Sequence, residues 1–151
     1  MIYPSNFESK IQFSEIRSLL KGYCLSQLGK DKVNAMAFGN DAKLINTALR
    51  QTREFRRMQE ETDDFPLQYF FDMRASIKRI RIEGTHLEEN EIFDLRRSLD
   101  TIAGIVKFLN RSDDDGNFDY PTLHALTEDV LTFPDLIRHI DQILDKYGKI
   151  K

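Results

Sequence analysis

The sequence predicts an all-α fold, an irregular bundle of several helices. Apolar residues recur at spacings of three and four in successive segments, as they do on the buried face of a helix. Residues that cap or begin helices stand in front of these segments. Only Lys78 to Glu83 alternates polar and apolar residues, and no partner strand is visible for it. The 151 residues suffice for one hydrophobic core, so we expect residues 1–151 to form a single helical domain without internal repeats.

Three helices are predicted in the first part of the chain. The first carries an apolar stripe over residues 13–24, and a short second helix is expected over 27–36. A long amphipathic helix should follow over 41–61, with Asn40 or Asp41 as its cap. The predicted buried stripe of this long helix consists of Leu44, Ile45, Ala48, Thr52, Phe55 and Met58.

The middle of the chain predicts a connection followed by the strongest helical pattern. Residues 65–71 form a compact apolar connection whose four aromatic residues should pack onto the core. A short helix is expected over 74–81, with a turn at Gly84. Residues 85–88, Thr-His-Leu-Glu, have the form of a capping box and precede a long helix over 88–111. Its predicted core stripe consists of Ile92, Leu95, Leu99, Ile102, Ile105 with Val106, and Leu109.

Two proline-initiated helices are predicted near the carboxyl end. Residues 112–119 are rich in turn formers and should be a polar loop. A helix is expected over 121–130 and another over 133–145, because proline is tolerated in a first helical turn.

Composition and charge restrict the classes of function. There are 22 basic and 25 acidic residues, giving a net charge of -3, which argues against a main duplex-DNA clamp in these residues. The single cysteine cannot form an internal disulfide, and the start of the chain lacks the features of a signal peptide. No apolar run is long enough to span a bilayer. These features predict a soluble, cytoplasmic chain with no membrane partner.

One local cluster of basic residues is a candidate for phosphate contact. It comprises Arg74, Lys78, Arg79 and Arg81. Three of the four would share a face if the segment is helical, and glutamate substitutions there should alter or abolish any salt-sensitive DNA binding. The alternative is an ordinary solvated helix face.

Two further motifs are candidates for ion or nucleotide binding. If Gly116 occupies the sixth position of an EF-hand loop, the first and twelfth positions are Arg111 and Thr122, where carboxylates are required. The pairs Gly29-Lys30 and Gly148-Lys149 lack the hydroxyl residue and upstream glycine of a P-loop. We therefore predict no metal, nucleotide or cofactor site in these residues.

The remaining reactive side chains give no catalytic pattern. Among His86, His124 and His139, which are isolated from one another in the sequence, His139 has Asp135 at helical spacing, and that pair suits an ordinary surface contact. Cys24 lies on an apolar stripe, which favours packing. We predict no catalytic residue. An interaction or DNA-handling module is favoured over a helical enzyme assembled from scattered carboxylates.

Beyond these patterns, dispersed residues of the chain resemble the amino terminus of type-two MutS proteins. The resemblance covers essentially the whole chain but includes no catalytic signature. In the first part it rests on Phe13-x-x-Ile16-x-x-Leu19-Leu20, Leu28-Gly29-Lys30, Pro66-Leu67, Asp72-Met73-Arg74-x-Ser76-Ile77-Lys78-Arg79 and Glu83-Gly84-Thr85-x-Leu87. In the last part it rests on Phe133-Pro134-Asp135-Leu136-Ile137, Ile140-Asp141 and Ile143-Leu144-Asp145-x-Tyr147-Gly148-Lys149-Ile150-Lys151.

The resemblance implies that the chain is the first part of a helical core, or lever, domain of a cytoplasmic bacterial protein. It also implies that residues 147–151 approach a lever helix, so we expect Lys151 to be the boundary of a fragment rather than a natural end. Such proteins lack the mismatch-reading domain. They continue into a clamp, an ABC-type ATPase that also forms a homodimer, and a small Smr nuclease domain. ATP and Mg are then cofactors of the whole protein and not of these residues. Branched DNA and the ribosome are its implied partners, with roles in suppressing recombination and rescuing ribosomes.

Three short matches to the wider family carry no role here. Residues 13–15, Phe-Ser-Glu, have the form of a mismatch wedge but begin an amphipathic helix. Residues 94–96, Asp-Leu-Arg, resemble a motif of Smr domains but lie within a helical stripe. The ATPase motifs have no counterpart. The alternative to the lever role is a self-contained helical adaptor that binds a protein through an apolar groove near residues 65–71.

Overall fold

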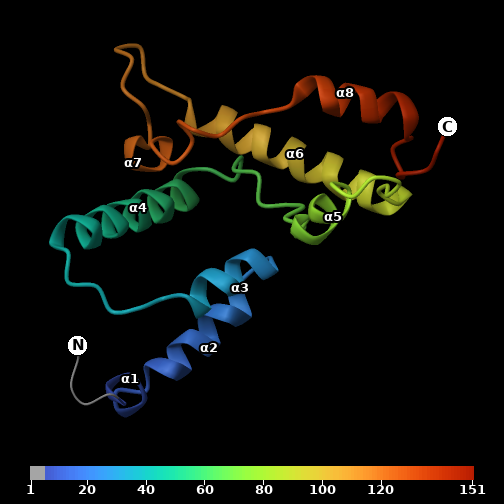
Figure 1. Cartoon of the computed structure of the whole chain (residues 1–151). Helices are drawn as coiled ribbons and strands as arrows, with labels where there is room; N and C mark the ends of the chain where they lie inside the picture. The colour runs from blue at the N-terminus through green and yellow to red at the C-terminus, as the bar shows by residue number, and fades with distance from the viewer. Residues whose placement is uncertain (1–5) are drawn as a thin grey trace. The chain divides into compact units, whose positions relative to one another are not determined.

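The computed structural model describes residues 6–151 and confirms the all-α fold (Figure 1). Those residues form eight helices and no strand, with two isolated bridges at Ser112–Phe118 and Leu144–Ile150. The chain divides into two compact units, Met1–Phe38 and Gly39–Lys151, which are described separately. The expected single domain stays a prediction. So does the lack of a signal peptide, because residues 1–5 lie outside the described part.

The amino-terminal unit (Met1–Phe38) contains α1 (Phe7–Lys10), α2 (Phe13–Tyr23) and α3 (Gln27–Asn34). The two predicted helices, α2 and α3, are therefore confirmed. Arg17 connects all three helices. Its guanidinium donates to both carboxylate oxygens of Glu8 at 2.9 Å and to the Asn34 carbonyl at 3.2 Å.

The larger unit (Gly39–Lys151) begins with α4 (Ala42–Glu61). Asp41 is its cap, because its Oδ1 accepts hydrogen bonds from the backbone N–H groups of Lys43 at 2.8 Å and Leu44 at 3.1 Å. Of the two predicted caps, the structure thus selects Asp41. The other helices are α5 (Arg74–Arg79), α6 (Glu89–Leu109), α7 (Pro121–His124) and α8 (Pro134–Ile143).

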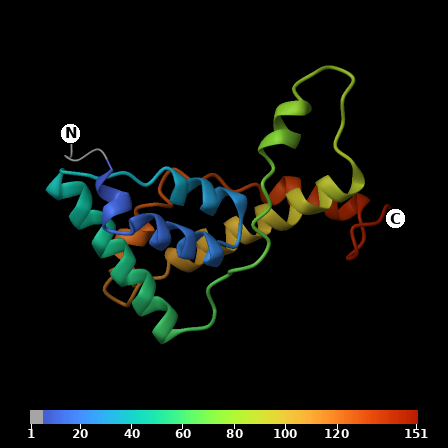
Figure 2. The same cartoon turned by 90° about the horizontal axis from the view of Figure 1, so that it is seen from below.

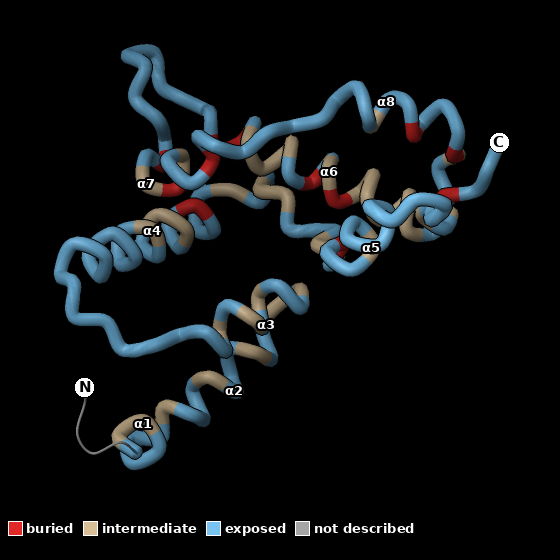
Figure 3. Tube along the Cα trace, viewed as in Figure 1, coloured by how far each residue is buried: buried red, intermediate tan, exposed pale blue. Residues whose placement is uncertain are grey.

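The buried core of the larger unit lies where α4, α6 and α7 meet (Figure 3). Its buried members are Met58, Phe108, Leu109, Tyr120 and Leu123. Phe65 adds an edge-on aromatic contact to this core, with its ring centroid 5.7 Å from that of Phe55 and 5.3 Å from that of Phe108. Glu54 holds the start of α7, because its carboxylate accepts from the N–H groups of Thr122 and Leu123 at 2.9 and 3.0 Å.

The prediction that all four aromatic residues of 65–71 pack onto this core is wrong. Phe65 does so, but Tyr69 is 46% exposed and stacks on Phe71 instead. Tyr69 also has a positive φ of 63°, in the left-handed region that residues with a side chain rarely adopt. The connection therefore provides one core residue and a separate aromatic surface.

The predicted capping box before α6 is placed three residues too early. The Thr85 hydroxyl donates to the carbonyls of Arg79 and Ile82 at 2.7 Å, so it closes the turn after α5 and is not available to cap α6. Glu88 is the actual cap. It forms a reciprocal box with Glu91, whose carboxylate accepts from the Glu88 N–H at 2.9 Å.

Two other predicted helical features are shorter or shifted. The helix expected over 121–130 ends at His124, where the Thr127 hydroxyl and N–H both donate to the His124 carbonyl. In α6, Ile102 is 37% exposed, whereas Ser98 and Thr101 are buried. The face of α6 that packs inward is therefore partly polar, because the hydroxyl groups of Ser98 and Thr101 donate to backbone carbonyls of residues 68–69.

Candidate functional site

The four predicted phosphate-contacting residues divide into two kinds. Arg74 pairs with Asp72, with Nη2 2.6 Å from Oδ2, and Arg79 donates to the Glu91 carboxylate. The side chains of Lys78 and Arg81 form no hydrogen bond or ion pair within residues 6–151. Two of the four cations thus already have carboxylate partners. Contact of these four residues with phosphate stays a prediction.

Glu91 is the junction between α5 and α6. Its carboxylate accepts from the Ser76 hydroxyl at 2.6 Å, from the Arg79 guanidinium and from the Glu88 N–H. These donors favour the ionised form and lower the pKa of Glu91 from its ordinary 4.5 to about 2, with the Arg79 hydrogen bond as the largest cause. The carboxylate therefore joins the two helices only while it is charged.

The Glu91 junction predicts a specific acid sensitivity. Because its folded-state pKa lies below its unfolded value, its contribution is complete above about pH 4.5 and is lost as the pH falls towards about 2. Glu91→Gln should flatten the pH dependence of unfolding in that window, measured by urea titrations followed by circular dichroism. Glu83→Gln is the matched control, since Glu83 makes no side-chain contact of this kind in the described residues. An unaltered pH profile for Glu91→Gln would contradict the assignment.

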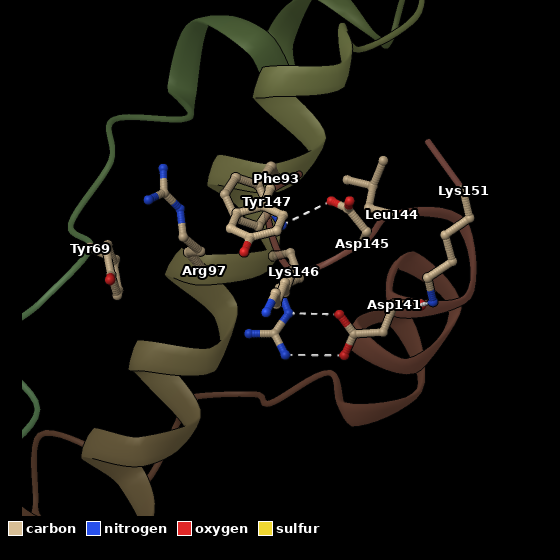
Figure 4. A pocket seen from close by; sticks show the side chains of 10 residues that line it. Tyr69, Phe93, Arg97, Asp141, Leu144, Asp145, Lys146, Tyr147 and Lys151 are labelled. Carbon is tan, nitrogen blue, oxygen red and sulfur yellow. Dashed lines mark hydrogen bonds and ion pairs between the residues drawn. The ribbon is translucent and has the colours of Figure 1, made fainter. Parts of the chain in front are cut away.

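One hollow of the larger unit is the α6–α8 pocket, with a volume of about 780 Å³ (Figure 4). It is open to solvent along α6, which lies beside α8 (Figures 1 and 2). Its lining combines aromatic, basic and acidic side chains. They are Tyr69, Phe93, Arg96, Arg97, Asp141, Leu144, Asp145, Lys146, Tyr147 and Lys151.

Arg96 connects α6 to α8 across one wall of the pocket. Its guanidinium binds both carboxylate oxygens of Asp141 at 2.8 and 3.0 Å and also binds Asp100 at 3.0 Å. The hydrogen bond from Arg96 lowers the pKa of Asp141 and, reciprocally, Asp141 raises the pKa of Arg96. Such a paired, bidentate contact is geometrically specific, so it fixes α8 on α6.

The turn after α8 is fixed to the start of α6. The Asp145 carboxylate accepts from the N–H groups of Tyr147 at 2.8 Å and Lys149 at 2.9 Å. The Glu89 carboxylate accepts from the Ile150 N–H at 2.9 Å and from the Lys149 ammonium at 3.1 Å. Both sets of donors lower the pKa of the carboxylate that they contact. This turn therefore has little freedom relative to α6.

A glycine is required where this turn meets α6. Gly148 has a φ of +79°, a conformation that residues with a side chain rarely adopt. A Cβ at this position would lie 2.5 Å from Cγ of Phe93, well inside van der Waals contact. The close approach of the Gly148 backbone to the Phe93 ring thus seats the turn on α6.

On the opposite wall of the pocket, the guanidinium of Arg97 lies among three aromatic rings. The Arg97 guanidinium carbon lies 4.8 Å from the Tyr69 centroid and 4.5 Å from the centroids of Phe71 and Phe93. Arg97 also pairs with Asp94 one turn earlier on α6. Cation–π contacts of this kind hold the aromatic connection against the helix.

The strained backbone of Tyr69 is held by the two buried polar residues of α6. The Thr101 hydroxyl donates to the Gln68 carbonyl at 2.7 Å, and the Ser98 hydroxyl donates to the Tyr69 carbonyl at 3.4 Å. A non-glycine residue in this conformation costs about 1–3 kcal/mol and is often found at functional sites. The apolar spacing along α6 does not predict this arrangement. Two hydroxyl residues on the inner face of an apolar helix were the available signal.

A second hollow of about 630 Å³ lies between residues 63–69 and α6, where the adaptor alternative places its groove. Its lining includes Phe65, Pro66 and Leu67, but also three carboxylates and a lysine. The carboxylates belong to Asp63, Asp64 and Asp100, and the lysine is Lys107. The groove is thus apolar only in part, and protein binding there stays a prediction.

The other candidate ligand residues make structural contacts. Asp135 pairs with Arg138 instead of His139. Asp113 accepts from the N–H groups of Asp115 and Asn117 at 3.0 and 2.8 Å, which shapes its loop. Within residues 6–151, no three His, Cys, Asp or Glu side chains are arranged to hold a metal ion.

The packing predicted for Cys24 is only partly found. Cys24 is half-buried at the end of α2, where its thiol donates to the Leu20 carbonyl at 3.2 Å. In the described part of the chain, no helix is long and apolar enough to cross a membrane.

Comparison with known proteins identifies relatives over almost the whole chain. The chain is 25% identical to "Endonuclease MutS2" of Latilactobacillus sakei over 140 residues and 26% identical to that of Geobacillus sp. over 150 residues. The corresponding protein of Symbiobacterium thermophilum is 25% identical over 141 residues. Each match covers 93% of this chain. The chain is related to the MutS2 proteins.

These MutS2 relatives are much longer than this chain. The chain spans 17–18% of their length. No family model matches the chain, and no solved structure matches it. The similarity is therefore to one segment of each relative's sequence.

Proposed function

We propose that this chain is the first part of the core, or lever, domain of a MutS2-type protein and that it performs no chemistry itself. The observation that carries the proposal is the coverage of the similarity, which extends over 93% of the chain but 18% of the relative. A lever requires helices that move together. The Arg96–Asp141 pair and the fixed turn at Gly148 suit that requirement, because they join α6 to α8 at two points.

In this proposal the chemistry belongs to the rest of the protein. The relatives are named endonucleases. The whole protein would be an ATP- and Mg-dependent, homodimeric, cytoplasmic protein that binds branched DNA through a clamp, with the ribosome as a second partner. The helices of this chain would transmit the state of the ATPase to that clamp through their packed contacts.

The proposal is tested first by reading the gene beyond the codon for Lys151. A P-loop, Gly-x-x-x-x-Gly-Lys-Ser/Thr, should be encoded several hundred codons downstream, since the ATPase needs one to hold phosphates. The protein that this frame encodes should then bind branched DNA with an affinity that changes on addition of ATP and Mg. A frame without a P-loop, or an affinity that ATP does not change, would contradict the lever role and favour the adaptor.

A further inference from the structure

The surface around α5 combines exposed isoleucines with cations that lack carboxylate partners. Its three isoleucines are between 41% and 63% exposed. The cations Lys78 and Arg81 form no side-chain hydrogen bond or ion pair within residues 6–151, and the one acidic residue of the following turn, Glu83, leaves the group with a net positive charge. We call this group the basic surface, and it consists of Ile77, Lys78, Ile80, Arg81 and Ile82.

The segment between α7 and α8 has the same composition with the opposite charge. Its three large apolar side chains are between 46% and 74% exposed. The carboxylates of Glu128 and Asp129 have no hydrogen-bond or ion-pair partner in the described part of the chain. We call this group the acidic surface, and it consists of Leu126, Glu128, Asp129, Leu131 and Phe133.

Both surfaces rest on turns that are closed by hydrogen bonds. The Thr85 hydroxyl donates to the carbonyls of Arg79 and Ile82 at 2.7 Å, which holds the turn after α5. The buried Thr127 hydroxyl donates to the His124 carbonyl at 2.7 Å, which holds the turn after α7. Surfaces that are already ordered lose less conformational entropy when they bind.

The two surfaces lie at opposite ends of α6. Ser76 of α5 donates to Glu91 in the first turn of α6, whereas Leu123 of α7 packs with Phe108 and Leu109 in its last turn. A helix of 21 residues extends about 30 Å. Figure 1 shows α5 and α7 at these two ends. The two surfaces of one chain are therefore too far apart to bind each other.

We propose that the basic surface of one chain binds the acidic surface of a second copy, head to tail. The cations Lys78 and Arg81 pair with the two carboxylates of the second copy, and the isoleucines pack on its leucines and phenylalanine. Apolar packing combined with opposed charges is typical of specific protein interfaces. A phosphate backbone would use the cations but would leave three isoleucines exposed to water.

This contact is different from the ATPase homodimer proposed for the whole protein. It uses two different surfaces of the same chain, so each added copy presents a free surface and the assembly can grow. The contact is formed entirely by the 151-residue chain, so it can be tested without ATP and without another domain. Failure of the ATP experiment does not affect it, and its own failure does not affect the lever role.

The test is sedimentation velocity of the nuclease-treated 151-residue chain at low salt. The native chain should sediment faster as its concentration rises, because it forms dimers and longer assemblies. Lys78→Glu with Arg81→Glu should stay monomeric, and so should Glu128→Lys with Asp129→Lys. An equimolar mixture of these two variants should form a dimer and no larger species, since only one matching pair of surfaces remains.

Matched variants separate the contact from a general effect of charge. Combining all four reversals in one chain should restore association, because the two surfaces then exchange their charges. Lys43→Glu with Arg50→Glu makes the same change in net charge on the exposed side of α4 and should leave association intact. Leu131→Ser should weaken it about tenfold through lost apolar burial. The changed residues are exposed, so the variants should fold, and circular dichroism checks this.

Four results would overturn the proposal. A native chain that stays monomeric at every concentration has no such contact. Association that persists when either surface is reversed uses other residues. A mixture of the two reversed variants that stays monomeric shows that the surfaces do not bind each other. Association that nuclease treatment removes is due to nucleic acid bridging the chains.

Discussion

Replacing Gly148 with alanine should destabilise the larger unit by about 2–5 kcal/mol. Two effects add: a left-handed backbone costs a residue with a side chain about 1–2 kcal/mol, and overpacking costs about 1–3 kcal/mol. The added methyl group would lie 2.5 Å from Phe93 Cγ and 2.6 Å from Cδ1, so the ring or the turn must move. Urea unfolding gives the free-energy change, and hydrogen exchange should show faster exchange of the Tyr147 and Lys149 N–H groups.

Gly84→Ala is the matched control for this prediction. Gly84 has a φ of +81°, almost the same as that of Gly148, but nothing lies within 4 Å of its added Cβ. It should therefore show only the backbone cost of about 1–2 kcal/mol. Adding Phe93→Ala to Gly148→Ala should cost less than the two single changes together, because the clash is removed. Equal losses for Gly148→Ala and Gly84→Ala would show that the Phe93 contact does not seat the turn.

Met58→Ala should destabilise the larger unit by about 2–5 kcal/mol through loss of core packing. Met58 is the most deeply buried side chain of the core, with 0% exposure, and it lies among Phe108, Tyr120 and Leu123. Truncation leaves a cavity lined by large rings that cannot easily close around it. The urea midpoint should fall with little change in slope, since the surface exposed on unfolding is nearly the same.

Two variants test whether the effect comes from this cavity. Met58→Leu conserves most of the volume and should cost less than about 1.5 kcal/mol. Met36→Ala removes the same side chain from a position that is 40% exposed in the amino-terminal unit, and should cost much less than Met58→Ala. A loss at Met36 equal to that at Met58 would contradict the assigned core.

Local signals in the sequence account for much of the helical framework. The apolar spacing of residues 13–24 and 41–61 predicted α2 and α4, and Asp41 caps α4 as its side-chain chemistry suggested. The errors occur where one side chain has a choice of partners. Thr85 bonds backward to Arg79 and Ile82 instead of capping α6. Spacing alone does not distinguish these two arrangements.

The candidate site was not predicted, because it depends on pairs that are distant in sequence. Arg96 and Asp141 are 45 residues apart, and Thr101 reaches a carbonyl 33 residues earlier. No periodic pattern joins such residues. The basic cluster around α5 was found by spacing, but the carboxylate that engages Arg79 lies on another helix. The clustering of basic residues in the sequence therefore does not show which of them have carboxylate partners in the structure.

The most direct test of the lever role is the change in affinity for branched DNA that ATP and Mg produce in the whole protein proposed to contain this chain. It should be measured with the native sequence and with Asp141→Asn, which removes the carboxylate that joins α8 to Arg96. We expect ATP hydrolysis to continue in the variant, while the ATP-dependent change in DNA affinity falls. A change in affinity that is the same in both proteins would contradict the role of these helices in transmitting the ATPase state.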